Sequence, residues 1–75
     1  MPVVRIRYKG KIYVRTVTRN FRGWYIMVSK GKEYWFEKDY EVQENYGWKI
    51  RNSEQLDPEF LRQIAPQLEE LYRSS

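Results

Sequence analysis

The sequence predicts a mostly β fold with one helix (β+α): a small barrel or a strongly twisted antiparallel sheet of about five strands, closed by a kinked C-terminal helix. Apolar and polar residues alternate with a period of two along much of the first half, which is typical of half-buried strands. Glycine-containing turns separate these stretches, and an apolar stripe at helical spacing ends the chain. The 75 residues have room for one core, so we expect a single domain over 1–75, with hairpins in 1–52 and a helix over 57–73.

The first predicted hairpin pairs residues 3–9 with 11–18. Val4, Ile6 and Tyr8 form an apolar set in the first strand, and a similar set begins at Ile12 in the second. Placing both sets on one face puts Tyr8 opposite Ile12 and leaves a three-residue loop, Lys9-Gly10-Lys11. The other face then pairs arginines, tyrosine and valine as Arg7 with Tyr13, Arg5 with Arg15, and Val3 with Val17.

A second hairpin, 24–29 with 33–38, follows the same rule. Val28 opposite Tyr34 and Ile26 opposite Phe36 give an apolar face around another three-residue loop, Lys30-Gly31-Lys32. This register turns Trp24 toward the core. Residues 19–23 read as a basic, partly exposed connecting turn.

The third hairpin is expected to pair Val42 with Ile50 around the loop 45–47. Gly47 then takes the left-handed position that ends a three-residue turn. Trp48 lies opposite Glu44 in this arrangement.

The last element is a helix whose start is marked by its capping residues. Asp57 is a good N-cap, Pro58 suits the first helical position, and Glu59 favours the positive end of the helix dipole. The apolar stripe consists of Phe60, Leu61, Ile64, Ala65, Leu68, Leu71 and Tyr72. Pro66 interrupts it, so we expect a kink near Ala65 or two short helices. Short twisted strands with such a helix favour an SH3-like barrel, with an open sheet crossed by the helix as the alternative.

Charge is distributed unevenly along the chain. Residues 1–38 hold ten Lys and Arg against two Glu, whereas residues 39–75 hold four Lys and Arg against eight Asp and Glu. Such a split indicates a basic binding surface whose partner is a polyanion or an acidic protein.

A nucleic-acid-binding face is the function that this pattern favours. The basic residues would neutralise phosphates, and rings and a methionine on the face opposite the predicted core would stack on bases or wedge between them. The predicted nucleic-acid-binding residues are Arg5, Arg7, Lys9, Lys11, Tyr13, Arg15, Arg19, Arg22, Tyr25, Met27, Lys30, Lys32 and Trp35.

Several function classes lack the residues that they need. The chain has no cysteine or histidine, so it lacks thiolate metal sites, the commonest metal ligand and the usual general base. No phosphate-binding glycine loop or metal-ligand cluster is present. We therefore expect a non-catalytic binding module with no cofactor, no metal and no small-molecule substrate. Without an apolar membrane span or signal segment, we expect a cytoplasmic protein that does not enter membranes.

The alternative function is a protein-interaction module that docks an acidic protein or peptide. Tyr40, Tyr46 and Trp48, near three acidic side chains, would line an aromatic groove. The basic face would steer an acidic partner in a salt-dependent way. Rings that lie with the arginines favour nucleic acid, and rings that gather at the acidic turn favour a peptide or protein.

Two stretches resemble the small archaeal SH3-like chromatin proteins, which bind DNA. The first is the opening run of alternating apolar and basic residues that leads into Tyr-Lys-Gly, Val4 to Lys11. The second is the entry to the helix, Ser53-Glu54 through Asp57-Pro58-Glu59-Phe60-Leu61. The resemblance covers about a third of the chain. It implies a three-stranded sheet that presents a tryptophan and apolar wedges to the DNA minor groove, with Trp24, Ile26 and Met27 as counterparts.

Overall fold

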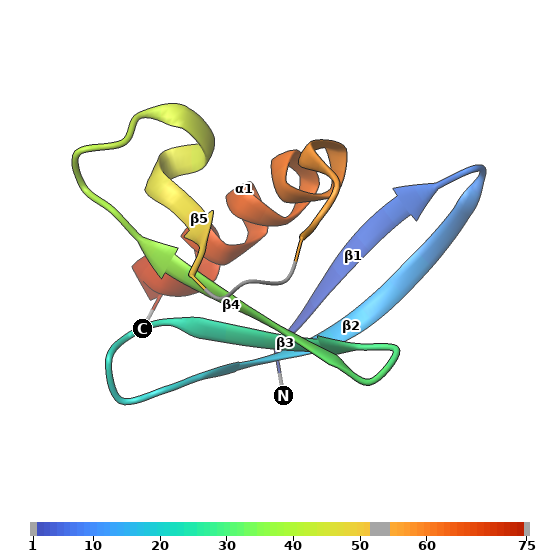
Figure 1. The fold of residues 1–75 in the computed structure, drawn as a ribbon, viewed down its shortest axis with the longest axis horizontal. Coiled ribbons are helices and arrows are strands. Elements are labelled where there is room, and N and C mark those ends of the chain that lie inside the picture. The colour runs from blue at the N-terminus through green and yellow to red at the C-terminus, as the bar shows by residue number, and fades with distance from the viewer. Residues whose placement is uncertain (1, 52–54, 75) are drawn as a thin grey trace.

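The structure is a computed structural model that describes residues 2–51 and 55–74. One five-stranded antiparallel sheet has the strand order β1-β2-β3-β4-β5, and its curled half-barrel is closed by a C-terminal helix (Figure 1). This confirms the predicted β+α class and its SH3-like form. The elements are β1 (Val3–Tyr8), β2 (Lys11–Arg19), β3 (Tyr25–Ser29), β4 (Lys32–Lys38), η1 (Glu44–Gly47), β5 (Trp48–Ile50) and α1 (Pro58–Ser74).

The first hairpin turns on two residues instead of three. Lys9 and Gly10 have φ of 50° and 77°, the positive values that a type I′ turn requires at both central positions. Tyr8 therefore pairs with Lys11, and Arg5 pairs with Val14. The predicted pairing of Arg5 with Arg15 is wrong, because the register differs by one residue.

The second hairpin repeats this geometry. Lys30 and Gly31 have φ of 53° and 77°, so Ser29 pairs with Lys32 and Met27 pairs with Tyr34. The expected three-residue loop is wrong here too. A shift of one residue moves every side chain of a strand to the other face. In β3, Tyr25 and Met27 consequently face the core, and Ile26 and Val28 face outward.

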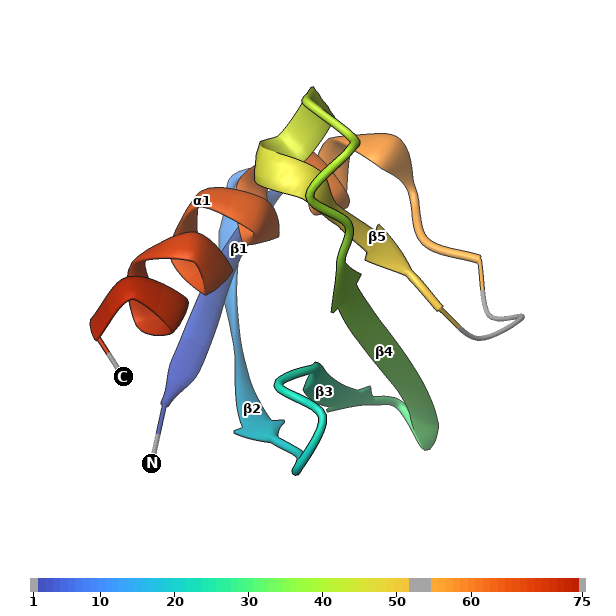
Figure 2. The same ribbon diagram turned by 90° about the vertical axis from the view of Figure 1, so that its left-hand side faces the viewer.

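The sheet curls where β2 changes partner. Residues up to Thr16 pair with β1, and Val17 to Arg19 pair with β3. The two hairpins consequently diverge (Figure 2), and both of their tips lie on the right-hand side in Figure 1. The concave side holds the core, which consists of Val4, Ile6, Val17, Tyr25, Met27, Phe36, Trp48, Ile64, Ala65 and Leu68.

Helix α1 begins as predicted. The Asp57 carboxylate accepts a hydrogen bond of 2.8 Å from the Glu59 backbone N–H, which is an N-cap interaction. The apolar stripe packs on the concave side, with Ile64 and Leu68 fully buried. The helix runs through Pro66 as one element, so the alternative of two short helices is wrong. Among the described residues, no helix is long and apolar enough to cross a membrane.

Two glutamines fasten α1 to the free edge of β1. Gln67 Oε1 accepts from Arg5 N at 2.9 Å, and Gln67 Nε2 donates to Arg5 O at 2.8 Å. Gln63 makes the same pair of bonds to Arg7, at 2.7 and 2.9 Å. Four helical residues rise about 6 Å and two strand residues about 6.6 Å, so the two spacings match.

The third predicted hairpin is wrong in its pairing. Ile50 pairs with Phe36 of β4, not with Val42, because β5 is the last strand of the meander. Gly47 does take the expected left-handed conformation, with φ of 85°. It lies against the chain at Asp39, where a Cβ on Gly47 would stand 2.4 Å from the Asp39 carbonyl oxygen.

We expect Gly47→Ala to destabilise the fold by about 3 kcal/mol, because the left-handed conformation and the backbone clash both oppose a Cβ. Gly10→Ala is the matched control: its φ is 77°, but nothing lies within 4 Å of the added Cβ. Its cost is the conformational term alone, about 1 kcal/mol. Urea unfolding measures both free energies. Equal losses in the two variants would contradict the tight packing at Gly47.

Candidate functional site

The outer face of β3 and β4 carries large apolar side chains. Ile26 lies opposite Trp35, and both are half-buried, while Val28 is 53% exposed. Trp24 directly precedes β3 and continues its alternation, so it lies on the same face as Ile26 and Val28. Its ring centroid lies 6.3 Å from that of Trp35. A cluster of partly exposed apolar groups on the side of a sheet opposite its core is a feature of binding surfaces.

Guanidinium groups stack on these rings in a continuous series. The Arg22 guanidinium carbon lies 5.6 Å from the Phe21 ring centroid and 5.4 Å from that of Trp24. Arg51, which follows β5, lies 5.6 Å from the Trp24 ring. We call Phe21, Arg22, Trp24, Trp35 and Arg51 the stacked strip. It places positive charge and flat apolar surface side by side.

The β2–β3 loop holds the strip's first members in place. Asn20 Oδ1 accepts hydrogen bonds from the backbone N–H groups of Arg22, at 2.9 Å, and Trp24, at 3.0 Å. Gly23 N also donates to Asn20 O at 3.1 Å, which closes the turn. Phe21 is 94% exposed on this ordered loop. This confirms the predicted basic, partly exposed connecting turn, except that Arg19 is the last residue of β2.

Two glutamates also lie on this face, each attached to the strip. Glu33 Oε1 accepts a hydrogen bond of 3.1 Å from Trp35 Nε1. Glu37 Oε2 lies 3.8 Å from Arg51 Nη1. Their carboxylates therefore orient strip residues, while Arg22 adds positive charge at the loop.

The structure places the predicted nucleic-acid-binding residues at several separate positions. Arg5 and Arg7 are exposed on the outer face of β1, Trp35 belongs to the stacked strip, and Arg22 lies on the β2–β3 loop. Arg19, at the end of β2, stacks on Tyr72 at 5.2 Å. The four lysines Lys9, Lys11, Lys30 and Lys32 stand at the two hairpin tips.

Four of those residues face the opposite way from the prediction. Tyr25 and Met27 are 3% and 1% exposed, so they belong to the core and not to a ligand-contacting face. Tyr13 and Arg15 lie on the concave side of β2, while Ile12 and Val14 face outward. The cause is the two-residue turn, which reverses the faces of β2 and β3 relative to a three-residue loop, while β1 and β4 keep their predicted core-facing residues.

Sequence analysis missed the outward direction of Trp24, Ile26 and Val28, and the position of Arg51 beside Trp24. The missed signal is the Lys-Gly dipeptide itself. Glycine at the second central position suits a type I′ turn, and a two-residue loop with that turn determines the faces of both strands.

The aromatic groove of the alternative function lacks one of its members. Trp48 is 1% exposed and packs in the core against Tyr25, with centroids 5.6 Å apart. Tyr40 and Tyr46 are exposed near the acidic turn. The prediction that Trp48 lines this groove is wrong, and most ring–guanidinium contacts lie elsewhere.

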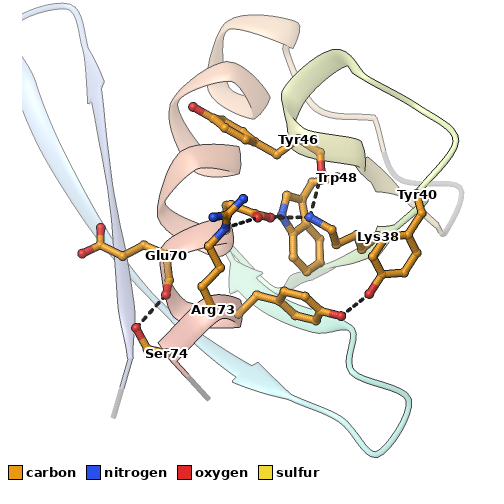
Figure 3. Close-up of polar contacts among 9 residues, drawn as sticks. Lys38, Tyr40, Tyr46, Trp48, Glu70, Arg73 and Ser74 are labelled. Atoms are coloured by element: carbon orange, nitrogen blue, oxygen red, sulfur yellow. Dashed lines mark hydrogen bonds and ion pairs between the residues drawn. The ribbon is translucent and has the colours of Figure 1, made fainter.

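A buried ion-pair cluster holds α1 to β4 and to η1. Lys38 Nζ donates to Glu69 Oε1 and, at 3.0 Å, to the carbonyl oxygen of Tyr46 (Figure 3). Glu69 also accepts from Arg73 Nε at 2.7 Å and from Trp48 Nε1 at 3.1 Å. These hydrogen bonds, that of Lys38 first, lower the pKa of Glu69 to about 2.

A second carboxylate at the same end of the molecule, that of Asp39, is held by a hydrogen bond and an ion pair. The backbone N–H of Glu41 and the ammonium of Lys49 lower the pKa of Asp39. Lys49 Nζ lies 3.0 Å from Asp39 Oδ2. Both carboxylates therefore stabilise the turn that connects β4 to β5. In the described ranges, no group of three metal-ligating side chains occurs.

The fold and the stacked strip define a small SH3-like β protein whose outer face carries aromatic rings with guanidinium groups stacked on them. Comparison of the chain with protein families, curated proteins and solved structures gives no match.

We expect Glu69→Gln to destabilise the protein by about 3 kcal/mol near neutral pH, because Lys38 keeps its charge with no carboxylate beside it. The carboxylate's contribution is complete above its ordinary pKa of 4.5 and is lost as pH falls through about 2. Urea unfolding near neutral pH and at about pH 2 measures the free energy of unfolding of the wild-type protein and of the variant. The difference in free energy of unfolding between the wild-type protein and the Glu69→Gln variant should shrink in acid. A constant difference would contradict the role of the Glu69 carboxylate. Glu70→Gln, one residue along the helix, is the control.

Proposed function

We propose that the protein is a non-catalytic module that binds nucleic acid through the outer face of β3, β4 and β5 and the β2–β3 loop. The observation that carries this proposal is the stacked strip. Arg22 and Arg51 are held on the rings of Phe21 and Trp24, with Trp35 beside them. Guanidinium groups contact phosphates, and apolar groups contact bases or the floor of a groove.

Charge distribution supports a polyanionic partner. Arg5 and Arg7 are exposed on the outer face of β1 and add positive charge to the outer side of the sheet. In the acidic half of the sequence, carboxylates form ion pairs with cations of the same chain, as Glu69 does with Lys38. A field of this kind speeds the encounter with a polyanion and makes binding dependent on salt.

The resemblance to the small archaeal chromatin proteins is part of the proposal. Trp24 and Ile26, two of the three counterparts that it implies, lie on the outer face, as contact with a groove requires. Met27, the third, is buried, and Val28 takes the outward place beside Ile26. We also propose a cytoplasmic location, where nucleic acid is accessible.

The test is a fluorescence titration with duplex DNA at two salt concentrations, with the tryptophans as reporters. Binding should weaken steeply with salt, because each neutralised phosphate adds about 0.9 to the log–log slope. Arg22→Gln should lower that slope by about 0.9. Arg62→Gln removes the same charge from the exposed face of α1 and should leave the slope unchanged.

Trp35→Leu keeps an apolar group but removes the ring, and should weaken binding by about 1–3 kcal/mol. No binding at low salt would overturn the proposal and favour an acidic protein as partner. A loss of affinity that is equal in the Arg22 and Arg62 variants would show attraction by net charge without a defined face.

A further inference from the structure

A cavity lies between the two hairpins, on the concave side of the sheet. This tip cleft has a volume of about 320 Å³ and reaches from the ends of the hairpins to the first turn of α1. Its floor is apolar, since Ile6 and Met27 are among its lining residues and are 6% and 1% exposed. The outer face has no part in it, so the tip cleft is separate from the stacked strip.

Aromatic rings form the walls of the tip cleft. Tyr8, Tyr13, Tyr34 and Phe60 all line it, from β1, β2, β4 and α1. The rings of Tyr8 and Phe60 meet edge to face, with centroids 5.2 Å apart. Rings from several elements around one cavity suit a flat ligand that stacks.

One guanidinium group enters this aromatic cavity. Arg15 Nε donates to Ser29 Oγ at 2.9 Å, and Arg15 Nη1 donates to Val14 O at 3.0 Å. The group lies 5.5 Å from the centroid of the Tyr13 ring. A guanidinium has five N–H donors, so some remain for a ligand. Within residues 2–51 and 55–74, no carboxylate forms an ion pair with Arg15.

Lysines flank the cleft on both hairpins. Lys30 lines it, and the Lys9 ammonium lies 5.2 Å from the centroid of the Tyr8 ring. The described carboxylates form no ion pair with either of them. The one acidic lining residue, Asp57, already accepts the helix N-cap bond from Glu59. Asp57 keeps its negative charge, but Arg15, Lys30 and Lys9 together outweigh it, so the net charge around the cleft is positive.

We propose that the tip cleft holds one unpaired base of single-stranded nucleic acid, with the flanking phosphates at Lys9 and Lys30. This inference rests on the proposed function and extends it to a class of substrate. A base that stays paired in a duplex presents only its edge in a groove. The aromatic rings that line this cavity stack instead on the flat face of a base, which only an unpaired base exposes. Cations on both sides of the cavity match a chain of phosphates that passes across it better than the single carboxylate of a peptide side chain.

The size of the tip cleft agrees with one base. About 320 Å³ is at the small end of the range for ligand pockets. A short oligothymidine should therefore bind more tightly than the same oligomer with an abasic nucleotide at its centre. The expected ratio is about tenfold, the value for the loss of one stacked base.

Ring-removing variants test the position of the base. Tyr8→Leu and Tyr34→Leu keep apolar side chains in the cleft, and each should lower oligothymidine affinity about tenfold while duplex affinity stays unchanged. Tyr40→Leu is the matched control, because Tyr40 is 76% exposed and lies outside the cleft. Thermal melts of each variant check that the fold is retained.

Three results would overturn the inference. Equal binding of the abasic oligomer would show that no base is held. Oligothymidine affinity that depends on Arg22 but not on the cleft tyrosines would place single strands on the stacked strip, and the proposed function would stand without the cleft. An acidic peptide that binds in a Tyr8- and Tyr34-dependent way, with no oligothymidine binding, would make the cleft a peptide site. If the wild-type protein binds neither oligothymidine nor duplex DNA, the proposed function itself is contradicted.

Discussion

Two Lys-Gly dipeptides in left-handed conformations determine the direction of most side chains in the sheet. A lysine at positive φ costs about 1 kcal/mol or more, and each hairpin accepts that cost at its tip. In return, the twist of a type I′ turn matches the right-handed twist of the strands. The alternation of faces in β1 to β4 follows from those turns, and so do the core, the stacked strip and the tip cleft.

The sheet separates two sets of large apolar residues by this alternation. Tyr25, Met27 and Phe36 fill the concave side, while the adjacent residues Trp24, Ile26 and Trp35 face outward. On the outer side, cation–π contacts restrain Arg22 and Arg51. A guanidinium that is already ordered loses less conformational freedom on binding, which favours affinity.

Elements marked by local chemistry could be predicted from the sequence. Asp57 and Pro58 identify the helix start, and the apolar stripe identifies its buried face, because capping and 3.6-residue periodicity are properties of neighbouring residues. The left-handed Gly47 was predicted for a similar reason. The curled sheet and the C-terminal helix followed from the alternation and the turns.

Face assignment could not be decided from hydrophobicity alone. In β2, Ile12 and Val14 are more apolar than Tyr13 and Arg15, yet the latter two face inward. Tyrosine and arginine have long side chains with polar ends, so they can line an open cavity that a wholly apolar set would leave in contact with water. The pairing of Ile50 depended on the meander continuing from β4, which the residues around Val42 do not indicate.

The two glutamines of α1 have a consequence for how copies of this protein meet. An exposed strand edge is a template on which another chain can add a strand, and such addition leads to fibres. Gln63 and Gln67 occupy the N–H and C=O groups of Arg5 and Arg7 that an incoming strand would need. The two glutamine side chains of α1 thus occupy the position beside β1 where a sixth strand would pair. The edge of β1 is therefore closed to strands of neighbouring copies along Arg5 and Arg7.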